Sequence, residues 1–286
     1  MRITCLLLLL LMGVSANSQR TDKKLQRELS EILGGFHGDV GIYVHDLKRN
    51  RIVSINSDTI FPTASMVKIP ILTGLMQKLE TGELNYHQTL TYKDSLLYEG
   101  VDILGSFKSN EKIELSKVVM LMLTMSDNTA SLWLQTLAGS GARVNELMDG
   151  LGLKDTRVNS RTPGREANRN MYGWGQTTPR EMATLMEKIV NKEVVSQAAS
   201  EKMLRLLGRN YWDEQGVSQV PTDVFVASKN GAVNATRNEV MFVNGKKCRY
   251  IFCICTKNNK DTSWENSNEA WEMTRKISAL LWGRMN

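Results

Sequence analysis

The chain has 286 residues, of which 42% are hydrophobic and 23% charged, which fits a globular protein of one domain or two closely packed lobes. The formal net charge is +6 at pH 7. Because the basic residues are spread along the chain without a recognition motif, we expect no nucleic-acid partner, and a mildly positive field that favours anionic substrates.

The first 18 residues differ in kind from the rest. Arg2 precedes the apolar run Leu6 to Leu11, and Val14-Ser15-Ala16 has the form of a signal peptidase site. The run is well short of the roughly 20 residues that span a bilayer, which argues against the alternative, a membrane anchor. We therefore predict a signal peptide over residues 1–18, export to the periplasm, and a mature protein without a stable membrane anchor.

Three cysteines remain after residue 18, namely Cys248, Cys253 and Cys255. An odd number in one apolar segment argues against a disulfide scaffold. Cys253 and Cys255 alternate with apolar residues, so both are expected on one side of a strand as small buried side chains, although one pair among the three could oxidise. The histidines are scattered, and we expect no metal or other cofactor.

The elements follow in chain order from hydrophobic periodicity. A helix is expected over residues 22–33, followed by a hairpin of strands over 39–47 and 50–56. A helical block comes next, with helices over 65–80, 115–124, 128–138, 143–150 and 179–191, and with a loop-rich stretch over 156–178. Strands return over 223–231, 238–244 and 249–256, and a last helix is expected from about 267 to 283.

Two strands alone do not make a stable sheet, so the N-terminal hairpin is expected to join the C-terminal strands. The helical block is then an insertion between parts of one sheet. This predicts an α/β lobe of about residues 19–62 and 213–286, and a helical lobe of about 63–212.

Three short motifs in the chain can carry chemistry. In TASMVKIP, residues 63–70, Ser65 and Lys68 share one face if the stretch is helical. In TMSDNTA, residues 124–130, Ser126-Asp127-Asn128 stands at a helix start, and in SKNG, residues 228–231, Lys229 stands within a strand pattern. Taken singly, each has an ordinary explanation: a chance pair, a helix cap, and a turn signal.

Together, and in this order, the motifs are those of class A β-lactamases and penicillin-binding proteins. The chain resembles that superfamily of penicillin-recognising serine hydrolases over essentially its whole mature length. The resemblance implies a two-lobe serine β-lactamase-like fold: an antiparallel sheet flanked by the N- and C-terminal helices, an inserted all-helical lobe, and the site between the lobes.

The resemblance also implies a role for each motif residue. Ser65 would be the nucleophile, which needs a base, and Lys68 can serve if burial and nearby cations remove its proton. Ser126 would relay a proton to the leaving nitrogen, and Asn128 would bridge Lys68 and the substrate amide. Lys229 would attract the substrate carboxylate.

The remaining predicted site residues come from the third motif and the strand after it. Gly231 lets the strand approach the ligand closely, and the amide of Ala232 would complete an oxyanion hole with that of Ser65. Asn230 replaces the family's Thr or Ser, but its amide can donate the same bond to a carboxylate. Arg237 is near the position of a second carboxylate-binding arginine, and a solvated surface arginine is the alternative.

The loop before Thr178 departs from the family pattern. Class A enzymes carry a glutamate there that orients the deacylating water, but here Thr162-Pro163 occupies its place. Glu166 comes four positions later and is either a replacement base or a solvated loop residue.

Three functions therefore remain open. The first is a β-lactamase acylated at Ser65 that hydrolyses the β-lactam ring, which confers antibiotic resistance. The second is a penicillin-binding D-Ala-D-Ala peptidase or esterase that releases β-lactams slowly. The third is a sensor of β-lactams or muropeptides without turnover. In each case we expect a monomer.

Overall fold

The computed structural model describes residues 19–286, so the predicted signal peptide lies outside the described residues. Its centre is a six-stranded sheet in the order β1-β3-β2-β11-β10-β9. The strands are β1 (Arg20–Thr21), β2 (Asp39–Asp46), β3 (Arg51–Ile55), β9 (Phe225–Val233), β10 (Thr236–Asn244) and β11 (Arg249–Lys257). The predicted hairpin is confirmed, and it joins the C-terminal strands because β2 pairs with β11.

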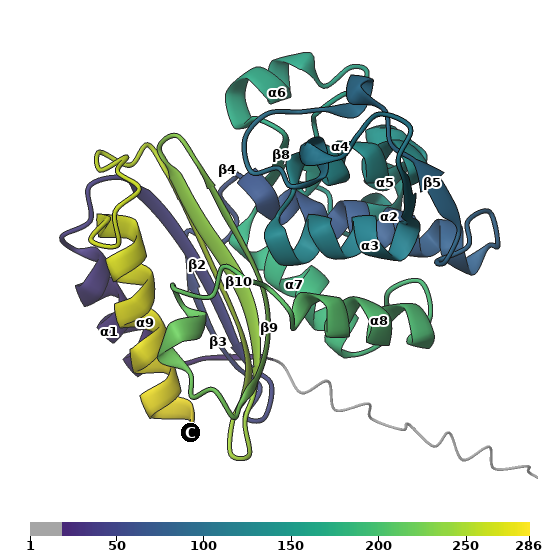
Figure 1. The fold of residues 1–286 in the computed structure, drawn as a ribbon. Coiled ribbons are helices and arrows are strands. Elements are labelled where there is room, and N and C mark those ends of the chain that lie inside the picture. Colours follow the sequence, from purple (N-terminus) through teal and green to yellow (C-terminus); the bar gives the residue numbers. More distant parts are fainter. Residues whose placement is uncertain (1–18) are drawn as a thin grey trace, which may run out of the picture.

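Two helices from opposite ends of the chain, α1 (Lys23–Leu33) and α9 (Glu269–Met285), cover one face of the sheet (Figure 1). Side-chain alternation explains how the sheet serves two cores. On β10, Met241 and Val243 belong to the core beneath α1 and α9, whereas Val240 and Phe242 belong to the core shared with the other helices. This arrangement confirms the predicted fold; the pairing is antiparallel except between the two-residue strand β1 and β3, which run parallel.

The helical lobe lies beside the other face of the sheet (Figure 1). Its helices are α2 (Lys68–Glu80), α3 (Leu115–Met120), α4 (Asn128–Leu137), α5 (Ser140–Gly150), α6 (Glu166–Tyr172), α7 (Pro179–Val190) and α8 (Gln197–Leu207). Helix α2 runs through the lobe with residues 68–76 all buried, and α7 packs on β2, β10 and β11. The short strands outside the six-stranded sheet are β4 (Phe61–Pro62), β5 (Thr89–Thr91), β6 (Lys112–Glu114), β7 (Arg157–Val158) and β8 (Gly175–Thr177).

Several local features differ from the predictions. The helix expected over 115–124 is divided into α3 and a π-helical turn, Leu121–Met125. The stretch read as loop contains α6, and α8 was not predicted although Ser196 caps it and Ala199, Met203 and Leu206 face the core at helical spacing.

Cys253 and Cys255 are buried on one face of β11, as predicted, with their Sγ atoms 3.9 Å apart, and no disulfide joins the three described cysteines. Over residues 19–286, no helix combines the length and apolar character needed to cross a membrane.

Candidate active site

Ser65 lies where the chain passes from the sheet into the helical lobe. It belongs to a short 3-10 helix, Ala64–Val67, that leads directly into α2, and Pro70 is tolerated because it falls in the first turn of α2. Ala64, directly before the serine, has φ of +45°. A left-handed conformation at a residue with a side chain is strained, and such strain is typical of functional sites.

The amine of Lys68 contacts residues of both the first and the second motif. Its Nζ lies 2.9 Å from Ser65 Oγ, 3.0 Å from Ser126 Oγ, 2.6 Å from the carbonyl oxygen of Ser126 and 3.1 Å from Asn128 Oδ1. Two of these four atoms, the carbonyl and the amide oxygen, can only accept hydrogen bonds. A neutral amine can donate to both and keep its lone pair for a hydroxyl proton.

Charge and burial both favour that neutral form. Lys68 is fully buried, which lowers its pKa well below the usual range, and the positive charge of Lys229 lowers the pKa further. The carboxylate of Asp127 opposes these effects. The structure therefore places a basic amine within hydrogen-bonding distance of the Ser65 hydroxyl.

Ser126 and Asn128 reach this amine because Asp127 fixes their turn. Ser126 ends the π-helical turn in a left-handed conformation with φ of +62°. Asp127 caps α4 by accepting from the Ala130 amide, and its other oxygen accepts from the amides of Ile103 and Leu104. One buried carboxylate thus holds both the helix start and the loop that runs beside it.

The third motif lies on β9, the edge strand nearest to Ser65. Lys229 is fully buried, and its Nζ donates to the carbonyl and side-chain oxygens of Asn230 at 3.0 and 3.1 Å. A Cβ added to Gly231 would lie 2.5 Å from the Thr63 carbonyl oxygen and 2.9 Å from the Ser65 nitrogen. The glycine is therefore required by contact with the segment that carries Ser65, and Ala232, the next residue on β9, lines the same cavity as that serine.

One buried charge near the site was not anticipated from the sequence. Glu239 lies on β10 opposite Asn230, and its Oε2 accepts from the Gly216 amide at 2.7 Å. Oε1 has no hydrogen-bond partner among the described residues. Burial raises the pKa of Glu239 to about 7. Burial also lowers the pKa of Lys229 to about 7, and the negative charge of Glu239 partly opposes this lowering.

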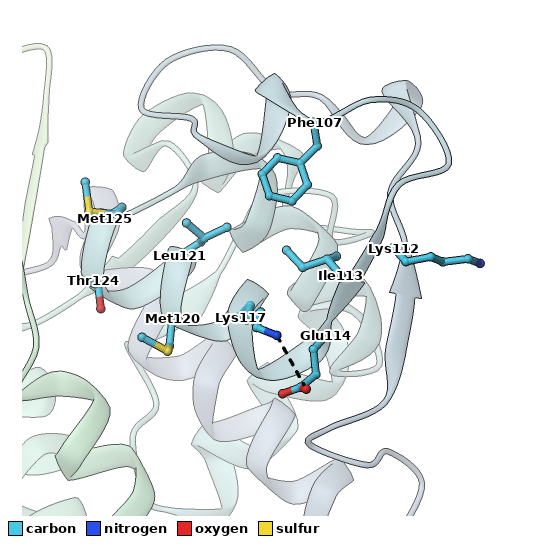
Figure 2. Close-up of a pocket in the computed structure, with 9 residues that line it drawn as sticks. All are labelled: Phe107, Lys112, Ile113, Glu114, Lys117, Met120, Leu121, Thr124 and Met125. Carbon is cyan, nitrogen blue, oxygen red and sulfur yellow. Dashed lines mark ion pairs between the residues drawn. The ribbon is translucent and has the colours of Figure 1, made fainter.

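A cavity of about 210 Å³ opens at Ser65 and Ser126 and follows the edge of β9 past Asn230 and Gly231. A larger one, of about 440 Å³, lies on the helical lobe beside α3 (Figure 2). Phe107, Ile113 and Leu121 give it apolar walls, and its rim carries the ion pair of Lys117 with Glu114 at 3.9 Å. Thr124 and Met125 of the second motif line it, but none of the predicted site residues does, so the chemistry assigns the site to the smaller cavity.

Comparisons with known proteins agree with this geometry. A family model described as "Beta-lactamase enzyme family" matches residues 24–285. The chain belongs to this family.

Its relatives in the family are distant. An imipenem-hydrolyzing beta-lactamase of Enterobacter cloacae is 24% identical over 93% of this chain and 92% of its own. Beta-lactamase VEB-1 of Pseudomonas aeruginosa is 21% identical, with 98% and 96% covered. PBP-A and a variant of it described as an acyl-enzyme complex with penicillin G both give a TM-score of 0.83 at 24% identity, covering 93% of this chain and 97% or 98% of theirs.

Within the β-lactamase fold, Glu166 is not among the described residues that line the cavity at Ser65. It is exposed at the start of α6, and its Oε1 accepts from the Gly164 amide at 3.1 Å. The neighbouring Arg165 instead points inward and donates to Asn159 and Gln176, which are both buried. The predicted role of Glu166 as a replacement base thus has no supporting contact in the described residues.

Arg237 lies on β10 directly opposite Ala232, but its guanidinium is occupied elsewhere. It donates to four backbone carbonyls, those of Asn234, Thr236, Thr262 and Ser263, and it is 1% exposed, so it is not the solvated arginine considered as an alternative. The role of Arg237 in binding a substrate carboxylate stays a prediction. To fill that role, the guanidinium would have to exchange some of these four hydrogen bonds for bonds to the substrate.

Proposed function

We propose that this β-lactamase-family protein is an exported serine hydrolase that β-lactams acylate at Ser65. The observation that carries the proposal is the contact between Ser65 Oγ and the amine of Lys68, whose pKa is lowered by burial and by the charge of Lys229. A serine hydroxyl is a weak nucleophile at its ordinary pKa, and an adjacent base is what activates it.

In the acylation step, Ser65 Oγ attacks the β-lactam carbonyl carbon while its proton passes to Lys68 Nζ. The new C–O bond forms, the carbonyl oxygen becomes an oxyanion, and collapse of this intermediate breaks the C–N bond of the ring. Ser126 Oγ, 3.0 Å from the same amine, hands its proton to the leaving nitrogen and takes one from Lys68, so Lys68 ends neutral.

The backbone amides of Ser65 and Ala232 are proposed to stabilise the oxyanion. Support comes from the close approach at Gly231, whose Cβ position is 2.9 Å from the Ser65 nitrogen. Fixed amides that need no reorganisation are effective at this task, and losing one such donor typically costs about 10²–10³-fold in rate.

Lys229 and Asn230 are proposed to bind the substrate carboxylate. The ammonium supplies charge, and the Asn230 amide supplies a hydrogen-bond donor at the strand edge. Asn128 Oδ1 accepts from Lys68 in the structure, which leaves its amide nitrogen to meet the substrate amide oxygen.

Hydrolysis of the acyl-enzyme is the step that distinguishes the candidate functions. We propose that β-lactam rings are turned over, but the position of Glu166 favours a second candidate, a D-Ala-D-Ala peptidase or esterase in which β-lactam adducts persist. With Glu166 bonded to Gly164, no carboxylate among residues 19–286 hydrogen-bonds to Ser65. A long-lived adduct without any peptide cleavage would indicate the sensor.

One experiment separates these functions. The mature protein is mixed with a tenfold excess of penicillin G, and ring opening and the intact mass of the protein are followed together. Ring opening beyond one equivalent supports the β-lactamase. If it stops at one equivalent, cleavage of a D-Ala-D-Ala peptide identifies the peptidase, and its absence leaves the sensor.

Three further proposals complete the function. Export to the periplasm rests on the sequence of residues 1–18, and N-terminal sequencing of the periplasmic protein tests cleavage near residue 18. We also propose that the protein is a monomer, which size-exclusion chromatography tests. The proposed lobes comprise residues 19–62 with 213–286 and residues 63–212, and limited proteolysis tests these bounds.

A further inference from the structure

The cavity at Ser65 continues beyond the motif residues to the N-terminal end of α9. There it is bounded by three tryptophans, Trp212, Trp264 and Trp271, none of which the motifs include. Ser126 lines the same cavity, whereas no residue of the 159–176 loop does. The tryptophans therefore share this cavity with Ser126, which is proposed to protonate the leaving nitrogen.

Two of the tryptophans, Trp264 and Trp271, contact each other and the buried Arg237. Trp264 and Trp271 meet edge to face with ring centroids 5.9 Å apart. The Arg237 guanidinium carbon is 4.6 Å from the Trp264 ring centroid and 5.0 Å from that of Trp271. Since Arg237 also binds the carbonyls of Thr262 and Ser263, it fixes the loop that presents Trp264, yet Trp264 stays 65% exposed.

The facing wall is equally anchored. The indole N–H of Trp212 donates to the Met125 carbonyl at 2.9 Å, one residue before Ser126. Trp212 thus ties the segment leading to β9 to the π-helical turn of the helical lobe. A preformed site of this kind loses little conformational entropy when a ligand binds.

The charge of the lining selects the kind of ligand. Among the described residues that bound the cavity, the one charged side chain is the exposed carboxylate of Glu214, and the polar remainder consists of hydroxyls and of the amides Gln215, Asn230 and Asn266. Arg237 is committed to four carbonyls beneath the rings. Indole faces and a carboxylate attract cations, and Lys229, which is proposed to bind the substrate carboxylate, is not among the residues that line the cavity.

We propose that this extension is a subsite for a planar cationic ring carried on the leaving-nitrogen side of the substrate, gripped by Trp264, Trp271 and Trp212. The inference rests on the proposed acylation at Ser65. It adds a substrate preference that the motif residues do not explain: β-lactams with a cationic ring substituent on the fused ring acylate the protein faster than their neutral counterparts do.

Cephalothin and cephaloridine provide the test, because they share the same acyl side chain and differ in the group at C3, acetoxymethyl against pyridiniomethyl. The second-order rate constant for Ser65 acylation is measured for each by intact mass. The substituent also changes the intrinsic reactivity of the ring. The informative quantity is therefore the ratio of the cephaloridine rate constant to the cephalothin rate constant, compared between the parent and Trp264→Ala.

We expect Trp264→Ala to lower this ratio about two- to fivefold, as for one cation–π contact at a solvent-accessible site. Acylation by penicillin G, which has no such ring, is measured in each variant, so that a general loss of reactivity at Ser65 is separated from a loss of the ring preference. Phe225→Ala is the matched control, because it also removes an exposed aromatic ring. Phe225 lies at the start of β9, whereas the residues of β9 that line the cavity lie near its end. Glu214→Gln should lower the ratio in the same direction.

An unchanged ratio in Trp264→Ala would overturn the subsite, and so would an equal fall in Phe225→Ala. In both cases acylation by penicillin G leaves the proposed function standing. If no β-lactam acylates Ser65, the proposed function itself fails, and the subsite fails with it.

Discussion

Gly231→Ala tests whether the contact between β9 and the nucleophile segment positions the site. The added Cβ would lie 2.5 Å from the Thr63 carbonyl oxygen, whereas ordinary contact begins at 3.4 Å, so the backbones must separate by about 0.9 Å. A misplacement of about 1 Å at reacting groups can cost about 10²-fold in rate. We therefore expect acylation of Ser65 to slow about 100-fold, which corresponds to about 2.7 kcal/mol of activation free energy.

The assay is the rate of covalent adduct formation with penicillin G, measured by quenched-flow mass spectrometry. Gly35→Ala is the matched control, since a Cβ there meets nothing within 4 Å and its φ is not in the left-handed region. Thermal unfolding of both variants verifies that they are folded. Acylation of Gly231→Ala within threefold of the parent would refute the reasoning that this close approach sets the geometry of the site.

Three more substitutions probe separate parts of the site. Lys68→Met should lower the acylation rate about 10²–10⁴-fold, the usual contribution of a positioned base, and a rate near that of the parent would exclude Lys68 from this role. Glu239→Gln removes a charge that raises the Lys229 pKa, so Lys229 should lose its proton at lower pH. Because protonated Lys229 is proposed to bind the substrate carboxylate, the acylation rate should decline above about pH 7, and in Glu239→Gln this decline should move to lower pH. An unmoved pH profile would show that Glu239 does not act on Lys229. Glu166→Gln should leave deacylation within twofold of the parent because its carboxylate bonds to Gly164, and a tenfold slower release would restore Glu166 as the base.

The sequence predicts the fold well because its strongest signals are local and periodic. The alternating runs that became β2, β3, β10 and β11 each serve a buried sheet, and the two strands of an isolated hairpin required further partners. The same local reasoning missed α8, where the apolar spacing was present but followed a turn-rich stretch.

The motif residues were predictable because the chemistry needs particular residue types in a particular order. What the sequence did not contain was the position of charges that act across strands. Glu239 stands in the run NEVMFVN, where alternation alone gives it no reason to be buried, and its relation to Lys229 arises only through the pairing of β10 with β9. Arg237 falls just before the predicted strand 238–244 but lies within β10, and the two tryptophans that contact it come from the loop before α9 and from α9 itself.

The most direct test of the central claim is a peptide map of the protein after a brief reaction with penicillin G. The account predicts one penicillin-derived adduct per molecule, located on Ser65, and no adduct in Ser65→Ala. An adduct on another residue, or labelling of Ser65→Ala at the rate of the parent, would contradict it.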